Sequence, residues 1–329
     1  MSDIHVTERS AFKSCRLYWD WNYRQGLVPI KTGVGALWFG TGVHVALATY
    51  YKYGSAPKDN WERWYNHERE TTLAGTYGSD LERIEKFNAL GSDMMSRYLP
   101  YAKQNDGWEV VGVEYPLRYE ILPGVFVVGS LDLLVRKNGK LWVVDHKTCA
   151  SFIDPEHLVF DDQMAMYLWL VWKVTGEVPG GAIYSMLRKV VPAEPMLVYK
   201  GTALSKAKDI DTTVEKYLEA IRANNFDERD YADVLARIGR NEFFRRETVI
   251  RSARELAILD EQVTLEATEM TKQNVSIYPT MTRDCTWSCQ FVDLCRTRLT
   301  GGDVQFTIDA NFRETSDTER YHQRWLEPA

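Results

Sequence analysis

The sequence lacks any apolar segment that approaches the length of a membrane-spanning helix, and its N-terminus has no signal-peptide pattern. We therefore expect a cytoplasmic protein. Cysteine is scarce, with five residues in a chain of 329. Because five is an odd number and the chain is long, we expect no disulfide framework. Internal repeats and low-complexity stretches are also missing. The apolar fraction of 45% supports a sizeable core, as one large domain or two modest ones.

Positive charge is not in excess either. Lys and Arg number 40 against 46 Asp and Glu, so the net charge is −6, which argues against bulk electrostatic attraction to nucleic acid. A local basic groove around an acidic metal site is compatible with that balance. Aromatic side chains, in contrast, are abundant, with 11 Trp and 18 Tyr. Most should lie in the core, and some are available to stack on bases.

A hairpin signal stands out among the features that are present. Asn138-Gly139 separates the apolar runs 129–136 and 141–144, and this dipeptide is the strongest short-range signal for a two-residue type I′ turn. The turn fixes the register of the two strands, with Lys137 facing Lys140. Every other opposed pair then follows by counting outward from the turn.

The register places Asp132 directly opposite Asp145 and Ser130 opposite Lys147, with Lys147 on the same face as Asp145. Two opposed carboxylates destabilise a mostly apolar hairpin. Three remedies exist: one carboxyl stays protonated, Lys147 neutralises one of them, or a divalent cation bridges both. Only the cation uses both carboxylates and leaves Lys147 free, and hard oxygen ligands suit Mg²⁺ or Mn²⁺. The alternative is a surface hairpin in water, but the apolar run 141–144 is typical of a buried strand.

The hydrophobic pattern predicts alternating groups of helices and strands. Helices are expected at 7–24, 36–53, 58–72, 79–103, 155–175, 203–224, 228–240 and 252–274. Strands are expected at 108–119, 124–136, 140–148, 180–188, 194–200 and 243–250. The last segment, 297–329, is polar, contains glycine and is expected to be partly irregular.

Four polar residues interrupt apolar stretches and are candidates for the site. His44 lies on an apolar helix, where a hydrogen-bonded core histidine is the alternative to a metal ligand. Glu114 interrupts an apolar strand and either approaches the Asp pair or holds a basic neighbour. Gln163 and Tyr167 share one face of a buried helix. Their polar tips need partners, either structural hydrogen bonds or the metal-site carboxylates and a substrate phosphate.

Three of the cysteines lie close together near the C-terminus. Cys285, Cys289 and Cys295 form C-x3-C-x5-C, and such a group in a reducing compartment suggests a metal centre that needs a fourth ligand. Cys149 would bring soft ligands against a hard-cation site, so Cys15 is the better choice. Four thiolates suit a [4Fe–4S] cluster or zinc. Unligated cysteines are the alternative.

Taken together, these pieces resemble the PD-(D/E)XK nuclease superfamily, and more narrowly its RecB-type and Cas4-like exonucleases with an iron–sulfur cluster, including phage-encoded members. The resemblance runs from about residue 10 to 296. The matching positions are His44 in 39–44, Asp132 in 129–132, Asp145-His146-Lys147-Thr148, Gln163-x3-Tyr167, Cys15, Cys285, Cys289 and Cys295.

The resemblance implies that Asp132 and Asp145 bind Mg²⁺ or Mn²⁺. His44 and the backbone carbonyl of His146 would help them to hold the metal. Lys147 would orient the attacking water or stabilise charge. By the same resemblance, the pair Gln163 and Tyr167 would shape the site or touch DNA, and the four matching cysteines would hold a [4Fe–4S] cluster, with zinc as the alternative.

The fold implied is α/β (α+β), a mixed central sheet flanked by helices, within a single nuclease domain. Its parts are expected to be a core at about 36–200, a helical addition at about 201–275, a cluster region at 10–24 and 276–300, and a polar tail at 301–329. The function implied is a metal-dependent DNA exonuclease that acts on single strands or ends, with a helicase or recombination protein as partner. The alternatives are a non-catalytic DNA-binding subunit of a helicase–nuclease or CRISPR-adaptation-like complex, and a structural cluster protein.

Overall fold

The computed structural model describes residues 2–30, 34–73, 76, 78–316 and 327. Its centre is a six-stranded mixed sheet in the order β1-β4-β5-β6-β9, with β3 paired to the other edge of β4. The mixed sheet flanked by helices confirms the predicted fold class at this level. The strands are β1 Ser2–His5, β3 Glu109–Leu122, β4 Val125–Lys137, β5 Lys140–Cys149, β6 Gly181–Arg188 and β9 Phe244–Val249.

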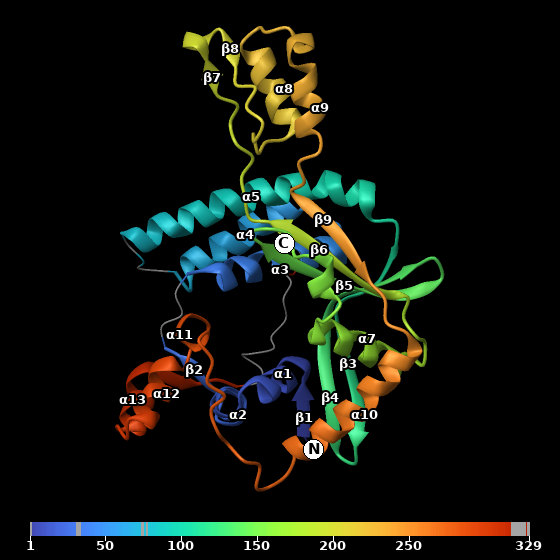
Figure 1. The fold of residues 1–329 in the computed structure, drawn as a ribbon, viewed down its shortest axis with the longest axis vertical. Coiled ribbons are helices and arrows are strands. Elements are labelled where there is room, and N and C mark those ends of the chain that lie inside the picture. The colour runs from blue at the N-terminus through green and yellow to red at the C-terminus, as the bar shows by residue number, and fades with distance from the viewer. Residues whose placement is uncertain (1, 31–33, 74–75, 77, 317–326, 328–329) are drawn as a thin grey trace.

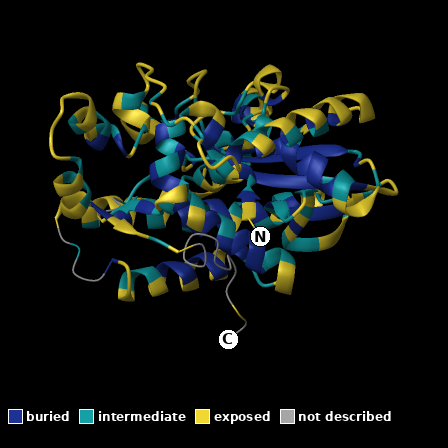
Figure 2. Ribbon diagram, turned by 90° about the horizontal axis from the view of Figure 1, so that it is seen from below, coloured by how far each residue is buried: buried dark blue, intermediate teal, exposed yellow. Residues whose placement is uncertain are grey.

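Helices cover both faces of this sheet (Figure 1). The buried helix α7 (Asp162–Thr175) and helix α10 (Ala253–Met270) pack on one face, in a cluster that includes Val143 and Ala182. The next residues along the same strands, Val144 and Ile183, belong to a separate cluster on the other face, against Tyr51. Because side chains alternate along a strand, β5 and β6 are apolar on both sides. Figure 2 shows these strands as a buried centre with exposed helix surfaces outside it.

Three long helices form the layer on the second face: α3 Ala36–Tyr53, α4 Pro57–Glu70 and α5 Ser79–Asn105. Tryptophan rings fill the gaps between them. A Cβ added at Gly42 would lie 2.1 Å from the Trp64 ring, and one at Gly91 would lie 2.1 Å from the Trp61 ring. Gly42 of α3 therefore makes room for a neighbouring side chain.

A small lobe is inserted between β6 and β9 and projects from the rest of the molecule (Figure 1). It contains β7 Leu197–Val198, β8 Ala203–Leu204, α8 Val214–Ala223 and α9 Ala232–Ile238. The lobe has a core of its own, made by Leu204, Tyr217, Ile221, Tyr231, Val234 and Ile238. The chain enters and leaves it side by side, because the Arg188 amide donates to the Phe243 carbonyl at 2.9 Å.

The N-terminal and C-terminal segments pack against each other. α1 (Val6–Ser14), α2 (Arg16–Trp19) and a π-helical turn at Asp20–Arg24 lead into β2 (Leu27–Pro29). From the other end come α11 (Cys285–Ser288), α12 (Val292–Leu299), α13 (Val304–Asn311) and β10 (Phe312–Glu314), which pairs with β2. One apolar cluster joins them, containing Leu17, Trp21, Leu27, Phe291, Leu294 and Phe312.

Several predicted elements need correction. The helix expected at 7–24 is interrupted at Cys15, whose extended backbone (φ −158°, ψ 113°) ends α1 and begins α2. The helix expected at 155–175 is two helices, α6 (Pro155–Leu158) and α7, because Asp161 is extended and caps α7 with its carboxylate. The helix expected at 203–224 begins only at Val214.

At the C-terminus the segment expected to be partly irregular contains the end of α12, all of α13 and strand β10. The rest of the predicted polar tail, at 317–326 and 328–329, lies outside the described residues. Strand β1 has no counterpart among the predicted elements. Within the part of the chain that the structure describes, no helix is long and apolar enough to span a bilayer.

Candidate active site and cysteine site

The hairpin turn has the predicted geometry. Asn138 and Gly139 have positive φ angles of 51° and 77°, as a type I′ turn requires. The ladder follows the expected register from Lys137–Lys140 to Leu133–Val144. It then stops one pair before Asp132 and Asp145, so the two acids lie just beyond the last pair of the hairpin ladder.

Strands β4 and β5 separate at that point. Strand β3 occupies the other edge of β4 along almost its whole length, so β5 and β1 share the remaining edge. We call the point where β5 leaves β4 the fork. There the carboxylate of Asp132 accepts a hydrogen bond of 2.7 Å from the backbone N–H of His146. A side chain thus takes the place of the next rung, and the expected pairing of Ser130 with Lys147 is not part of the ladder.

His44 reaches the fork from α3. Its Nδ1 lies 3.2 Å from Oδ1 of Asp132. Burial alone would raise the pKa of Asp132, but the charge and hydrogen bond of His44, together with the His146 amide, outweigh burial and hold that pKa well below its ordinary value. Asp132 is therefore a carboxylate at any physiological pH.

Asp145 lies in a different environment although it is the neighbouring acid. Its two carboxylate oxygens lie 2.9 and 3.1 Å from Nζ of Lys147. Burial raises the pKa of Asp145 to about 6; Lys147 opposes this rise and the charge of Asp132 adds to it. Burial would lower the pKa of Lys147, but Asp145 outweighs it and the pKa stays above the ordinary value. Lys147 is thus a lasting positive charge.

Gln163 and Tyr167 continue this chain of contacts from α7. The Lys147 ammonium donates to Oε1 of Gln163 at 3.2 Å, and Nε2 of Gln163 donates to the hydroxyl of Tyr167 at 3.1 Å. The Tyr167 phenol is buried, which raises its pKa further from neutrality. Both predicted residues therefore lie beside the acids, and their contacts fix the direction of the Lys147 side chain.

Sequence reasoning left two roles open for Glu114, approach to the Asp pair or contact with a basic neighbour, and the structure brings it to the fork. It lies between the ladder pairs Val113–Leu133 and Tyr115–Leu131, hence across from Asp132. Its φ of 44° is rare for a residue other than glycine. One ligand atom each from His44, Glu114 and Asp132 lie within 4.8 Å of one another. The only signal in the sequence was an acid within an apolar strand.

The side chain of His146 packs against α3, and its ring centroid lies 6.3 Å from that of His44. Its ring stacks on Tyr51 of α3, with centroids 5.7 Å apart and planes 16° apart. Burial lowers the pKa of His146 to about 3, so the imidazole is neutral. Its ring nitrogens have no hydrogen-bond partner among the described residues. The role predicted for His146 concerns its backbone carbonyl, and this orientation of the ring is compatible with that role.

The donors at the fork fit a hard divalent cation. Carboxylate oxygens from Asp132 and Glu114 and an imidazole nitrogen from His44 lie within 4.8 Å of one another. Asp145 is outside this group and is held by Lys147, but it is near enough for the charge of Asp132 to raise its pKa. Carboxylate, carbonyl and imidazole donors suit Mg²⁺ and Mn²⁺. Without a cation the concentrated negative charge has Lys147 as its nearby counter-charge, and Asp145 takes up a proton more readily than an ordinary carboxyl.

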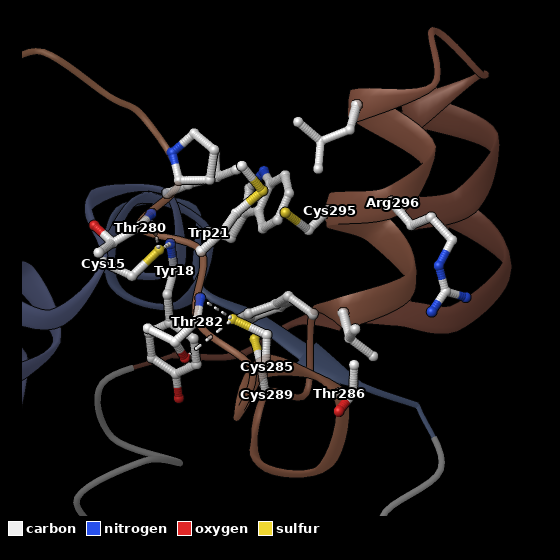
Figure 3. Close-up of a pocket in the computed structure, with 16 residues that line it drawn as sticks. Cys15, Tyr18, Trp21, Thr280, Thr282, Cys285, Thr286, Cys289, Cys295 and Arg296 are labelled. Carbon is white, nitrogen blue, oxygen red and sulfur yellow. Dashed lines mark hydrogen bonds between the residues drawn. The ribbon is translucent and has the colours of Figure 1, made fainter.

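Four cysteines lie at a second site, between the ends of the chain. Cys15, Cys285, Cys289 and Cys295 line one cavity of about 230 Å³. Figure 3 shows Cys15 approaching from the α1–α2 break and the other three from the C-terminal segment. The fifth cysteine, Cys149, lies elsewhere, at the end of β5, where its thiol donates to the Leu187 carbonyl at 3.7 Å.

Backbone N–H groups already point at two of these sulfurs. Sγ of Cys15 accepts from Tyr18 and Thr280 at 3.5 and 3.4 Å, and Sγ of Cys285 accepts from Thr282 at 3.4 Å. The pKa values of Cys289 and Cys295 are raised, first by burial and then by the neighbouring thiols. Four thiols that line one cavity, two of them accepting from backbone amides, fit a cationic metal centre.

Comparison with known protein families identifies the group to which the chain belongs. The model of the PD-(D/E)XK nuclease superfamily matches residues 5–296. The chain belongs to this superfamily. In this PD-(D/E)XK nuclease the sequence Asp145-His146-Lys147 lies where β5 leaves β4. No curated protein matches the chain.

Solved structures add little. The one described as "Crystal structure of SSO0001" is 12% identical and covers 90% of this chain and 86% of its own, with a TM-score of 0.31. This likeness is too weak to indicate anything further about this PD-(D/E)XK nuclease.

Proposed function

We propose that the protein is a metal-dependent DNA exonuclease that hydrolyses phosphodiester bonds of single strands or DNA ends. Membership of a nuclease superfamily supports cleavage of nucleic acid in general. The observation that carries the proposal is the fork itself, where Asp132, Asp145 and Lys147 meet at one point of a rigid sheet. The family match extends to residue 296 and so includes the cysteines.

The metal would be held by Asp132 and Asp145, with His44, the backbone carbonyl of His146 and Glu114 completing the set. When bound, a divalent cation lowers the pKa of water and polarises the phosphate. The sheet fixes both acids, so their positions need no rearrangement when the substrate arrives.

Lys147 acts through its charge. With a pKa above the ordinary value it cannot serve as a general base near neutral pH. Its ammonium group instead stabilises the negative charge that develops on the phosphate oxygens as the attacking oxygen approaches. Gln163 keeps the ammonium group directed at the fork, and Tyr167 fixes the orientation of the Gln163 amide. These two are positioning residues.

The cysteine site would hold a [4Fe–4S] cluster, with zinc as the alternative. A cluster there would join α1 and α2 to α11 and α12. Its role would be structural, because it lies between the chain ends and not at the fork. Iron and zinc analysis of protein purified without oxygen distinguishes the two metals.

The nuclease proposal is tested with oligonucleotides labelled at the 5′ or 3′ end, single-stranded and duplex, in Mg²⁺, Mn²⁺ or EDTA. We expect stepwise shortening from an end that requires the cation. Asp145→Asn and Lys147→Met should each lower the rate about 100-fold or more. Lys140→Met, on the same strand but exposed at the hairpin turn, should cleave like the wild type.

Cleavage by Asp145→Asn at the wild-type rate would reject the site. If the wild type binds DNA but leaves every substrate intact, the protein is instead a DNA-holding subunit. Internal cuts on circular single strands would replace the exonuclease by an endonuclease.

A further inference from the structure

The turn before α7 carries an aromatic ring in solvent. Phe160, three residues before Gln163, is 87% exposed. An exposed phenylalanine is not unusual alone, since folded proteins leave much apolar surface uncovered. Its meaning depends on whether the ring is held in place and on what lies beside it.

The backbone that carries Phe160 is fixed on both sides. Leu158 is buried in the main core, and the Phe160 amide donates to the His157 carbonyl at 3.2 Å. Arg251, at the end of β9, donates to the carbonyl of Val159. Asp161 then caps α7 by accepting from Met164 at 3.1 Å. The ring therefore projects from a rigid turn, which limits the entropy lost when a ligand covers it.

The same turn borders the fork. The carboxylate of Asp161 is close enough to act electrostatically on Lys147. Gln163, on the first turn of α7, accepts directly from the Lys147 ammonium. Phe160 directly precedes Asp161, which acts on Lys147, and lies three residues before Gln163, which contacts Lys147. It is therefore at the rim of the proposed catalytic centre.

Positive charges lie on another part of that rim. The Lys189 amide donates to the Cys149 carbonyl at 2.8 Å, two residues beyond Lys147. The charges of Lys189, Arg188 and Arg245 all act on the Cys149 thiol. Arg188 and Arg245 are each paired with an acid, Asp211 and Glu242, so Lys189 is the cation of the three that a polyanionic backbone would meet most directly. The acidic net charge of the whole protein does not prevent such local attraction.

We propose that Phe160 is a stacking platform for one unpaired base of the DNA strand whose phosphate lies at the fork. This rests on the proposed nuclease function and adds the form of its substrate. Stacking on a protein ring requires a base without a partner in a duplex, so the strand must be single where it enters. The ring is indifferent to the identity of the base, because every base has a π face.

The test compares two single-stranded oligonucleotides, one with all its bases and one with abasic residues near the end that is cut, on wild type, Phe160→Ala and Phe160→Trp. Base–ring stacking predicts that Phe160→Ala raises KM about tenfold on the intact strand and leaves kcat nearly unchanged. Phe160→Trp should restore the KM. On the abasic strand the wild type and Phe160→Ala should have equal KM values.

Phe306→Ala is the matched control, because Phe306 on α13 is also strongly exposed, at 71%, and lies far in sequence from the fork. It should behave as the wild type on both strands. Equal KM values for wild type and Phe160→Ala on the intact strand would overturn the platform while leaving the nuclease in place. If the wild type cuts no DNA at all, the proposed function fails first, and the two failures are therefore distinguishable.

Discussion

Asp132 and Asp145, the two acids at the fork, hold protons with very different strength. The pKa of Asp132 lies well below the ordinary range, whereas burial and the charge of Asp132 raise that of Asp145 to about 6. A cation must displace the proton of Asp145 and meets none on Asp132. Asp145 should therefore contribute a pH dependence to metal binding between pH 5 and 7.

We expect Mn²⁺ affinity to be nearly constant above pH 7 and to fall by up to about tenfold per pH unit below pH 6, because one proton competes with the metal. Isothermal titration calorimetry from pH 5 to 8 measures this. In Asp145→Asn the affinity should be low and independent of pH over that range. An unchanged slope in the variant would mean that another group releases the proton.

In the metal-free protein, the raised pKa of Asp145 makes the fold less stable as the pH rises. A carboxyl whose folded pKa is raised stabilises the fold below its unfolded pKa, near 3.8, and that contribution disappears as the pH rises through about 6. The free energy of unfolding of metal-free wild type should thus fall between pH 5 and pH 7 relative to that of Asp145→Asn, which has no carboxyl to ionise there. Urea denaturation in EDTA at both pH values checks it, and an equal change in the two proteins would contradict the electrostatic explanation.

Glu114 offers a third test at the residue scale. Glu114→Gln keeps the side-chain shape and removes a charge beside His44 and Asp132, so Mn²⁺ affinity should fall by about tenfold or more. Glu109→Gln, at the exposed start of the same strand, is the control and should leave affinity unchanged. Equal affinities for both variants would exclude Glu114 from the metal site.

Sequence reasoning placed Asp132 and Asp145 together but left two alternatives open for Glu114, for a physical reason. A two-residue turn determines the facing pair through local geometry alone. The position of Glu114 depends on the pairing of β3 with β4 and on a left-handed backbone at one residue, and neither leaves a local pattern. The interruption of an apolar strand by an acid showed only that Glu114 needed a partner.

At the scale of elements, α3 carries two glycines with opposite requirements. A Cβ at Gly42 would meet the Trp64 ring at 2.1 Å, whereas one at Gly40 would meet only Oγ1 of Thr148, at 3.6 Å. Gly42→Ala should therefore lower the free energy of unfolding by about 1–3 kcal/mol through overpacking. Gly40→Ala should be neutral or stabilise by up to about 1 kcal/mol through helix propensity.

Urea denaturation of Gly42→Ala and Gly40→Ala measures the two free energies of unfolding. Because both lie in one helix, helix propensity acts equally and the difference isolates the contact with Trp64. Equal stability of the two would mean that the tryptophan can move aside at little cost.

Element prediction succeeded where periodicity was long and failed where a single side chain redirects the backbone. The bounds of α3 match the prediction, and β4 and β5 match within one residue. The helices expected at 7–24 and 155–175 are broken because Cys15 and Asp161 cap the following helices from an extended backbone. Their apolar periodicity continues across the break, so the pattern alone gave no sign of it.

At the scale of the whole molecule, the four cysteines join the two ends of the chain across about 270 residues. Borrowing the chain-entropy model of a disulfide, a metal centre there would contribute about 5 kcal/mol. Cys15→Ala should therefore lose most of its bound metal and its cooperative thermal transition should fall well below that of the wild type. Metal analysis and calorimetry on protein purified without oxygen measure both.

Cys149→Ala is the control, because Cys149 lies outside the cysteine cavity. It should keep its metal and its transition temperature. Wild-type metal content in Cys15→Ala would remove Cys15 from the ligand set.

The four cysteines predicted that the two ends of the chain lie together, but no pattern in the sequence predicted strand β1. Ser2–His5 is short and half polar, and its partner on β4 lies more than 100 residues away. The small lobe was likewise predicted as part of longer helices, because its core of six residues is spread over several short elements. Short elements whose stability comes from distant partners leave little trace in local sequence.

The side-by-side entry and exit of that lobe has a practical meaning. Since Arg188 and Phe243 are already hydrogen-bonded neighbours, a short glycine-containing reversal could replace the excursion between them without disturbing β6 or β9. The lobe can therefore be exchanged or removed as a unit while the sheet that carries the fork stays intact.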